Sequence, residues 1–175
     1  MPTAKMAGML AAAIISDTVM FKSPTCTQRD IAMANRMARI GNVRLEDLGK
    51  AIFSATCGDD KTTLAMLNTD YKEFHIAGHD LAVSQITCMD SDRLLLRKDE
   101  FLYEMERIRL KQGLDSVVLM LTDVLLEGTY LIFVGDEENI RNAFGIKETD
   151  ENISFQPKLM SRKKQVIPTL SALWG

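Results

Sequence analysis

The sequence is poor in the residues that build disulfide-stapled or zinc-bound proteins: among 175 residues it has three cysteines and two histidines. Cys26, Cys57 and Cys88 are odd in number and widely spaced, with no CxxC pair, which argues against a disulfide framework and a structural zinc site. They are typical of reduced thiols in the cytoplasm. His75 and His79 flank a predicted turn, a pattern more typical of a hairpin surface than of a metal site.

Long apolar runs and a strong basic bias are also missing. No apolar stretch reaches the ~20 residues that a membrane-spanning helix needs, and the Ala-rich candidate at 6–15 lacks the basic start of a secretory signal. The net charge of -3 argues against general nucleic-acid binding, which requires a broad basic face. The remaining composition, 46% hydrophobic and 26% charged, predicts a globular protein of one domain, or of a small domain plus part of another.

The first 58 residues predict helices and no strand. The predicted helices cover residues 3–16, 28–39 and 45–56. Apolar residues surround the first of them, which predicts burial on more than one side, and Thr27 is the expected N-cap of the second. The polar segment 57–60 contains a glycine and is the predicted domain boundary, with a short helix expected at 62–67.

From Tyr71 onward the pattern changes to strands and helices. Strands are predicted at 73–77, 81–87, 117–121, 129–134 and 152–155, and helices at 92–112, 137–144 and 168–174. The first two strands flank a turn at 77–80 and predict a hairpin. The continuous apolar run at 117–121 predicts a central strand covered on both faces. The predicted fold class is therefore α/β, a mixed β-sheet flanked by helices and preceded by helices that have no sheet of their own.

Two polar features carry the functional prediction. Residues 162–164 are three consecutive cations, an arrangement that suits phosphate because Arg offers a planar fork of donors and Lys a mobile charge. Composition alone favours a solvated turn here. If Arg162 and Lys163 contact one anion, the backbone must form a loop, a bulge or a strand end, because adjacent residues of a strand point to opposite faces.

Asp17 is the second feature. It stands at the C-terminal end of an apolar helix, where the helix dipole is unfavourable for a carboxylate, so it either caps the next turn or faces a cation.

Three stretches in register resemble family II, manganese-dependent inorganic pyrophosphatases of the DHH phosphoesterase superfamily. The stretches cover residues 7–27, 72–74 with 82–86, and 161–168. The resemblance runs over nearly the whole chain and implies an N-terminal DHH domain that holds manganese and a C-terminal domain whose cations clamp pyrophosphate. It implies that residues 1–58 are the helical C-terminal end of a DHH domain, 59–70 a linker with a short helix, and 71–175 the substrate-binding domain.

The same resemblance implies residue roles. Asp17 would bridge two metal ions, and Lys72, Arg162 and Lys163 would bind phosphate. The family's HxDxD motif, its further Asp and its DHH triad do not occur in this sequence, and one carboxylate cannot hold two divalent cations that each take about six ligands. The chain is therefore expected to be a C-terminal segment, inactive alone, with Mn²⁺ (or Co²⁺ or Mg²⁺) held by a missing DHH domain.

The expected reaction is hydrolysis of pyrophosphate to two phosphates. Two other functions stay open: a DHH-family exopolyphosphatase segment, which would act on longer chains, and a stand-alone, non-catalytic phosphate-binding or interaction module. No nucleic-acid or membrane partner is expected, whereas a homo-oligomer is among the expected assemblies. The helices at 3–16 and 28–39 are expected to expose an apolar surface or to cover it by self-association.

Overall fold

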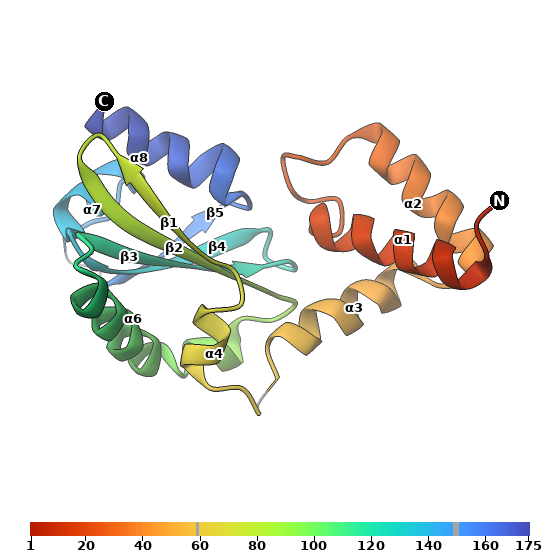
Figure 1. Ribbon diagram of the computed structural model, residues 1–175, viewed down its shortest axis with the longest axis horizontal. Helices are drawn as coiled ribbons and strands as arrows, with labels where there is room; N and C mark the ends of the chain where they lie inside the picture. Colours follow the sequence, from red (N-terminus) through yellow and green to blue (C-terminus); the bar gives the residue numbers. More distant parts are fainter. Residues whose placement is uncertain (59, 149–150) are drawn as a thin grey trace.

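The computed structural model describes residues 1–58, 60–148 and 151–175, which form a helical half and a sheet half (Figure 1). The helical half contains α1 (Ala4–Asp17), α2 (Gln28–Gly41) and α3 (Leu45–Thr56). The strands are β1 (Tyr71–Ile76), β2 (His79–Cys88), β3 (Ser116–Asp123), β4 (Gly128–Gly135) and β5 (Ile153–Pro157). The helices of the sheet half are α4 (Thr63–Leu67), α5 (Asp92–Leu95), α6 (Lys98–Gln112), α7 (Glu137–Phe144) and α8 (Ile167–Trp174), the last preceded by a π-helical turn at Arg162–Val166.

The helices α1 and α2 pack closely because small residues face each other. Ala7 and Ala11 of α1 are fully buried in a cluster with Met37 of α2. A Cβ atom added at Gly41 would lie 2.8 Å from the backbone nitrogen of Gly8, so the two backbones meet where neither carries a side chain.

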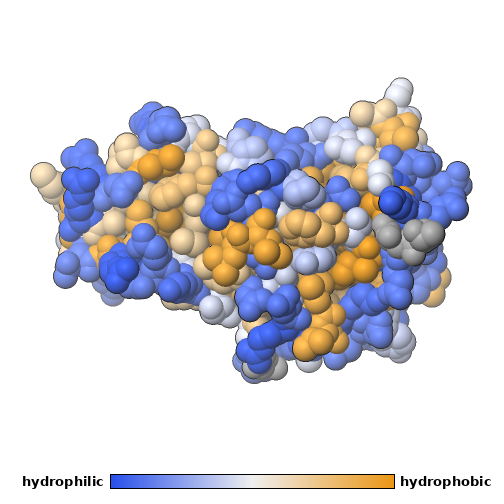
Figure 2. All heavy atoms as spheres, turned by 180° about the vertical axis from the view of Figure 1, so that it is seen from behind, coloured by the Kyte–Doolittle hydropathy of each residue, from blue (hydrophilic) through white to orange (hydrophobic). Residues whose placement is uncertain are grey.

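The outer face of α1 differs from the prediction. The sequence predicts burial on more than one side, whereas Met6, Met9 and Leu10 are 56%, 67% and 49% exposed. The apolar outer side chains have no neighbouring element to cover them among the described residues, and Met33 of α2 is 37% exposed as well. Apolar atoms interrupt the hydrophilic surface of both halves on the face drawn in Figure 2. The apolar surface expected of helices without a sheet is therefore present.

The sheet has the strand order β1-β2-β3-β4-β5, with β2 and β3 parallel and the other neighbours antiparallel. The central strand β3 is buried along its whole length because α6 covers one face of the sheet and α7 and α8 cover the other (Figure 1). Its side chains alternate: Leu119 and Leu121 join the cluster around Phe101 of α6, whereas Val118 and Met120 join the cluster on the α8 side. The predicted fold class, a mixed sheet flanked by helices, is confirmed.

The helix predicted over 92–112 is divided into α5 and α6. The amide of Ser91 donates to the Asp123 carboxylate at 2.9 Å, which anchors the start of α5 to the end of β3. Between the two helices, Arg97 donates from Nη1 to the carbonyl of Lys61 at 3.0 Å. Both partners are distant in sequence, and they hold α5 as a separate short helix. Helix propensity depends on neighbouring residues only, so it does not predict this break.

The hairpin between β1 and β2 turns at Ala77 and Gly78, whose φ angles of 49° and 88° are both left-handed. These angles suit the two-residue turn whose twist matches the strands, but a Cβ in this conformation costs about 1–2 kcal/mol. Since glycine also costs more entropy on folding, Ala77→Gly should raise the free energy of unfolding by about 0.5 kcal/mol in urea titrations. Gly78→Ala is the matched control and should lower it, and a loss of stability in Ala77→Gly would contradict this turn geometry.

Candidate functional site

A cleft of about 540 Å³ lies where the helical half meets the sheet half. Its wall is built from α1 and the following loop, α3, the start of β1, β2 and the turn before α8. The lining residues are Ser16, Asp17, Val19, Ser23, Thr25, Ile52, Phe53, Thr56, Thr69, Asp70, Lys72, Gln85, Thr87, Met160, Ser161, Arg162 and Lys163. The four residues singled out from the sequence, Asp17, Lys72, Arg162 and Lys163, thus all line one cleft.

The basic stretch forms a helical turn that leads into α8. Ser161 caps this turn, and its Oγ accepts from the amide of Lys164 at 3.3 Å. The side chain of Gln165 folds back, with Oε1 accepting from the Ser161 amide at 2.9 Å, and so holds the chain as it enters the turn. Because successive side chains of a helical turn do not alternate between opposite faces, Arg162 and Lys163 meet the geometric condition for sharing one anion.

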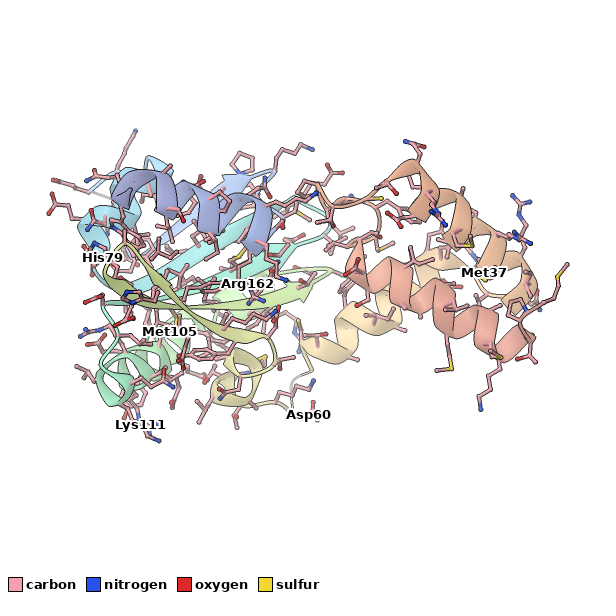
Figure 3. All side chains as sticks on the ribbon, turned by 45° about the horizontal axis from the view of Figure 1, so that its top comes forward. Met37, Asp60, His79, Met105, Lys111 and Arg162 are labelled. Atoms are coloured by element: carbon pink, nitrogen blue, oxygen red, sulfur yellow. The ribbon has the colours of Figure 1, made fainter. Side chains whose placement is uncertain are left out.

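Arg162 is buried, at 5% exposed, and lies on the side of the sheet that faces the helical half (Figure 3). Its Nη1 donates to the carbonyl oxygens of Asp70 and Val83 at 2.8 Å and 3.0 Å, and its Nη2 donates to the Asp70 carboxylate at 2.7 Å. Its buried Nε has no hydrogen-bond partner among the described residues. A buried donor without a partner is unfavourable, so Arg162 retains hydrogen-bonding capacity that its protein partners do not use.

Lys72 lies next to Arg162. It pairs across the hairpin with Val83, the residue whose carbonyl accepts from Arg162. The side chains of Lys72 and Lys163 are exposed, and an ammonium group on a flexible stem adjusts its position readily. One fixed and two mobile cations therefore converge on the same wall of the cleft.

The opposite wall presents Asp17 at the end of α1, with its side chain exposed. Thr18 closes the next turn, its Oγ1 accepting from the Phe21 amide at 3.2 Å. The chain passes through three consecutive left-handed residues, Val19, Met20 and Phe21, with φ angles of 49°, 52° and 67°. This conformation is costly, above all for the β-branched Val19, and strain of this kind persists where packing enforces it and concentrates at functional sites.

Apolar packing joins the two halves beside the cleft. Ile15, Val19 and Phe53 of the helical half form one cluster with Val124 and Met160 of the sheet half. Each of these five side chains is at most 8% exposed. A small shared core therefore connects the two walls of the cleft in this conformation.

An ion-pair network also crosses between the halves. Glu127 accepts from Lys22 at 2.8 Å and from Lys158 on the other side. Lys164 of the basic turn donates from Nζ to the carbonyl of Pro24 at 3.3 Å. Hydrogen bonds from Lys158 and Lys22, reinforced by their charges, lower the pKa of Glu127 to about 2.

Glu127 should add to the acid sensitivity of the fold. A carboxyl group whose pKa is lower in the folded state stabilises the protein above its unfolded pKa of about 4.3 and loses that contribution as the pH falls to about 2. The free energy of unfolding of Glu127→Gln should therefore fall less steeply over this pH range than that of the wild type, by a small amount because solvent screens a side chain that is 40% exposed. Urea titrations at a series of pH values measure the slope. Glu46→Gln in the first turn of α3 is the control, and an equal change in both variants would contradict the prediction.

The carboxylates of the cleft do not form a metal site by themselves. Asp17 and Asp70 are the acidic residues that line it, and Asp70 is paired with Arg162. Within the described part of the chain, no three side chains of His, Cys, Asp or Glu come together to hold a metal ion. Since a hard divalent cation takes about six ligands, these residues do not fit a divalent metal without ligands from elsewhere.

The comparisons with known proteins agree with this architecture. The family model described as DHHA2 domain matches residues 51–173. The chain belongs to the DHHA2 domain family. The match takes in the whole sheet together with Lys72, Arg162 and Lys163, whereas Asp17 precedes it.

This DHHA2 chain also resembles longer proteins over nearly its whole length. It is 41% identical to the manganese-dependent inorganic pyrophosphatase of Methanothrix thermoacetophila, over 96% of this chain and 55% of the relative. It is 37% identical to the cobalt-dependent inorganic pyrophosphatase of Clostridium perfringens, over 98% of this chain and 32% of the relative. A crystal structure described as a family II inorganic pyrophosphatase from Methanococcus jannaschii superimposes with a TM-score of 0.88 at 33% identity, over 99% of this chain and 57% of that one. The resemblance to this family is confirmed, and the chain spans about half the length of these relatives or less.

One further finding concerns membranes. Across residues 1–58, 60–148 and 151–175 of this DHHA2 chain, no helix has both the length and the apolar character that crossing a bilayer requires.

Asp70 is the cleft residue that sequence reasoning missed. Its partner Arg162 lies 92 positions later, and no motif connects the two. The one available signal is the spacing of two between Asp70 and Lys72, which in an extended segment places both side chains on the same side. An acid so placed beside a candidate phosphate-binding lysine is a candidate for holding a neighbouring cation.

Proposed function

We propose that this DHHA2 chain is the substrate-binding part of a metal-dependent inorganic pyrophosphatase, which hydrolyses diphosphate to two phosphates. The observation that carries the proposal is the convergence of three cations from two remote segments on one cleft, opposite Asp17. The names of the relatives support it, because they describe manganese-dependent and cobalt-dependent inorganic pyrophosphatases.

The chemistry of diphosphate explains the roles of the cations. Diphosphate is compact and highly charged, and its hydrolysis places negative charge on the leaving phosphate. In the proposal, Arg162 is a fixed donor at the floor of the cleft, while Lys72 and Lys163 close on the phosphoryl oxygens as mobile charges. A fixed guanidinium sets the orientation of the anion, and the lysines neutralise charge where it develops.

Asp17 belongs to the metal side of the proposed site. It contributes one carboxylate toward Mn²⁺, Co²⁺ or Mg²⁺, and the remaining ligands are not among the described residues. In this arrangement residues 1–58 are the end of the metal-binding domain, 59–70 connect, and 71–175 bind substrate. Asp59, at the proposed boundary, lies outside the residues that the structure describes. Placing metal and cations on separate domains allows the site to open for product release.

Calorimetric titration of the chain with diphosphate, in the presence of a metal chelator, tests the cation part of the proposal. Diphosphate should bind more tightly than phosphate or sulfate, since two linked phosphoryl groups engage more of the cations, and the affinity should fall with added salt. Equal affinities for diphosphate and sulfate would overturn the proposal. Clearly tighter binding of long polyphosphate would instead favour an exopolyphosphatase.

Asp70→Asn should tighten diphosphate binding about threefold to tenfold. The carboxylate of Asp70, whose side chain is 43% exposed, repels an anion in the cleft and competes for Arg162. Asparagine keeps an oxygen that accepts from Nη2 but removes the charge. The same titration measures the change, with Glu73→Gln, a charge change on β1 outside the cleft lining, as the control. Weaker binding by Asp70→Asn would show instead that the carboxylate is required to position Arg162.

A further inference from the structure

Two cysteines from different halves of the protein meet behind the cleft. Cys57 follows α3 and Cys88 ends β2, and both line a cavity of about 290 Å³. The Cys57 thiol donates to the carbonyl oxygen of Thr87, the residue before Cys88, at 3.6 Å, and the Cys88 thiol donates to the carbonyl oxygen of Thr122 at 3.6 Å. Cys57 also packs against the apolar cluster that contains Cys88. Cys26 is not part of this cavity and lies in the loop before α2.

The two thiols have unequal environments. Cys57 is partly exposed, whereas Cys88 is 1% exposed. Interaction with the neighbouring Cys88 thiol, together with the charge of Lys61, lowers the pKa of the Cys57 thiol despite its burial. Interaction with the Cys57 thiol and burial, followed by the charges of Cys57, Asp123 and Asp90, raise the pKa of the Cys88 thiol. Cys57 is therefore both the more accessible and the more readily ionised of the two thiols.

An accessible thiol whose pKa is lowered, beside a buried thiol that lines the same cavity, is the arrangement of an attacking and a resolving cysteine. A pair of cysteines that serves only packing does not require one member to reach solvent, and the cavity beside Cys57 gives a reagent access to it. The spacing of the two residues in sequence hides this relationship, because no CxxC motif brings them together.

We infer that Cys57 and Cys88 form a thiol–disulfide exchange site that reacts with a low-molecular-weight disulfide. The Cys57 thiolate attacks one sulfur of the reagent, forming a mixed disulfide and releasing one thiolate. Cys88 then loses its proton and attacks the Cys57 sulfur, which forms the Cys57–Cys88 bond and releases the second thiolate. The two protein thiols are oxidised, the reagent disulfide is reduced to two thiols, and the two protons pass to the released thiolates.

The internal disulfide would tie together the two walls of the cleft. Phe53 lies one helical turn before Cys57, Thr87 directly precedes Cys88, and both Phe53 and Thr87 line the cleft. Oxidation therefore fixes the distance between the end of α3 and the end of β2. The thiol–disulfide exchange at Cys57 and Cys88 does not rest on the proposed function. Only an effect of the disulfide on ligand binding in the cleft would rest on it.

Intact-mass analysis of the full chain after treatment with glutathione disulfide tests the inference. Wild type and Cys26→Ser should both lose two hydrogen atoms without gaining glutathione, and peptide mapping should join Cys57 to Cys88. Cys88→Ser should stop at one glutathione on Cys57, because the resolving thiol is missing, and Cys57→Ser should form no internal disulfide. A stable glutathione adduct on the wild type, or a bond that includes Cys26, would overturn the inference.

Thermal unfolding of the oxidised protein supplies a second readout. A cross-link that closes the segment between Cys57 and Cys88 restricts the unfolded chain, so Tm should rise by roughly 5–10 °C and return to its original value on reduction. Cys57→Ser and Cys88→Ser should show no such shift after the same treatment. If the disulfide forms but Tm falls, the bond requires distortion of the native contact and the inference fails.

Discussion

Arg162→Ala should lower the free energy of unfolding by about 3 kcal/mol, whereas Lys163→Ala should change it by less than about 0.5 kcal/mol. Arg162 is buried and donates three hydrogen bonds, so its truncation removes a donor from the carbonyls of Asp70 and Val83 and the counter-ion from the Asp70 carboxylate. Lys163 follows directly in the chain but is exposed. Urea unfolding followed by circular dichroism measures both changes.

Arg162→Lys separates the charge from the geometry of the guanidinium. A lysine keeps the positive charge but cannot present the planar fork that reaches the two carbonyls and the carboxylate together. It should therefore recover only part of the lost stability, with a deficit of about 2 kcal/mol. If Arg162→Ala were as stable as the wild type, the buried network would not hold the fold together and Arg162 would not be a fixed cation.

The anchoring of Arg162 has a consequence for binding. A side chain already held by three hydrogen bonds would lose little freedom when an anion arrives, so any contribution that Arg162 makes in the proposed site would carry little ordering cost. Because its loss also destabilises the fold, a weaker affinity in Arg162→Ala would not by itself identify a direct contact. The exposed lysines are the residues at which binding and stability can be separated.

Features that depend on neighbouring residues were predictable from the sequence. Thr27 caps α2 as expected, in a capping box with Asp30. Gly113 and Gly145 end α6 and α7 in the left-handed conformation that favours glycine. The apolar run that includes Leu119 predicts the central strand, since only a sheet covered on both faces buries every position.

Features that depend on distant partners were not predictable in the same way. The resemblance pointed to Arg162, but no local pattern shows that its guanidinium is held by Asp70. Val19 occupies a left-handed conformation that propensity would assign to glycine, and it is held there by packing against the sheet half. Cys57 and Cys88 looked like isolated thiols in the sequence, and only the tertiary fold brings them to one cavity. The cleft is built from several such long-range contacts. The sequence could therefore indicate which residues line the cleft, but not how they are arranged.

Replacing Lys72 and Lys163 together with alanine should weaken diphosphate binding about 100-fold, with little loss of stability. Each exposed ammonium that contacts a phosphoryl oxygen contributes a charge-assisted hydrogen bond, and the loss of each should cost about tenfold in affinity, or about 1.4 kcal/mol. Since both side chains are exposed, the fold keeps its buried contacts. Calorimetric titration in a chelator gives the affinity, and urea titration gives the stability.

The matched control changes the net charge equally at positions outside the cleft. Lys5 and Lys111 are exposed on α1 and α6, and Lys111 lies far from Arg162 (Figure 3). If replacing Lys5 and Lys111 weakened binding as much as replacing Lys72 and Lys163, the attraction would come from overall charge and the cleft would have no special role. If the control binds as the wild type does, the position of the cations determines the affinity. That outcome would support the proposed division of tasks, in which Arg162 orients the anion and Lys72 and Lys163 neutralise it.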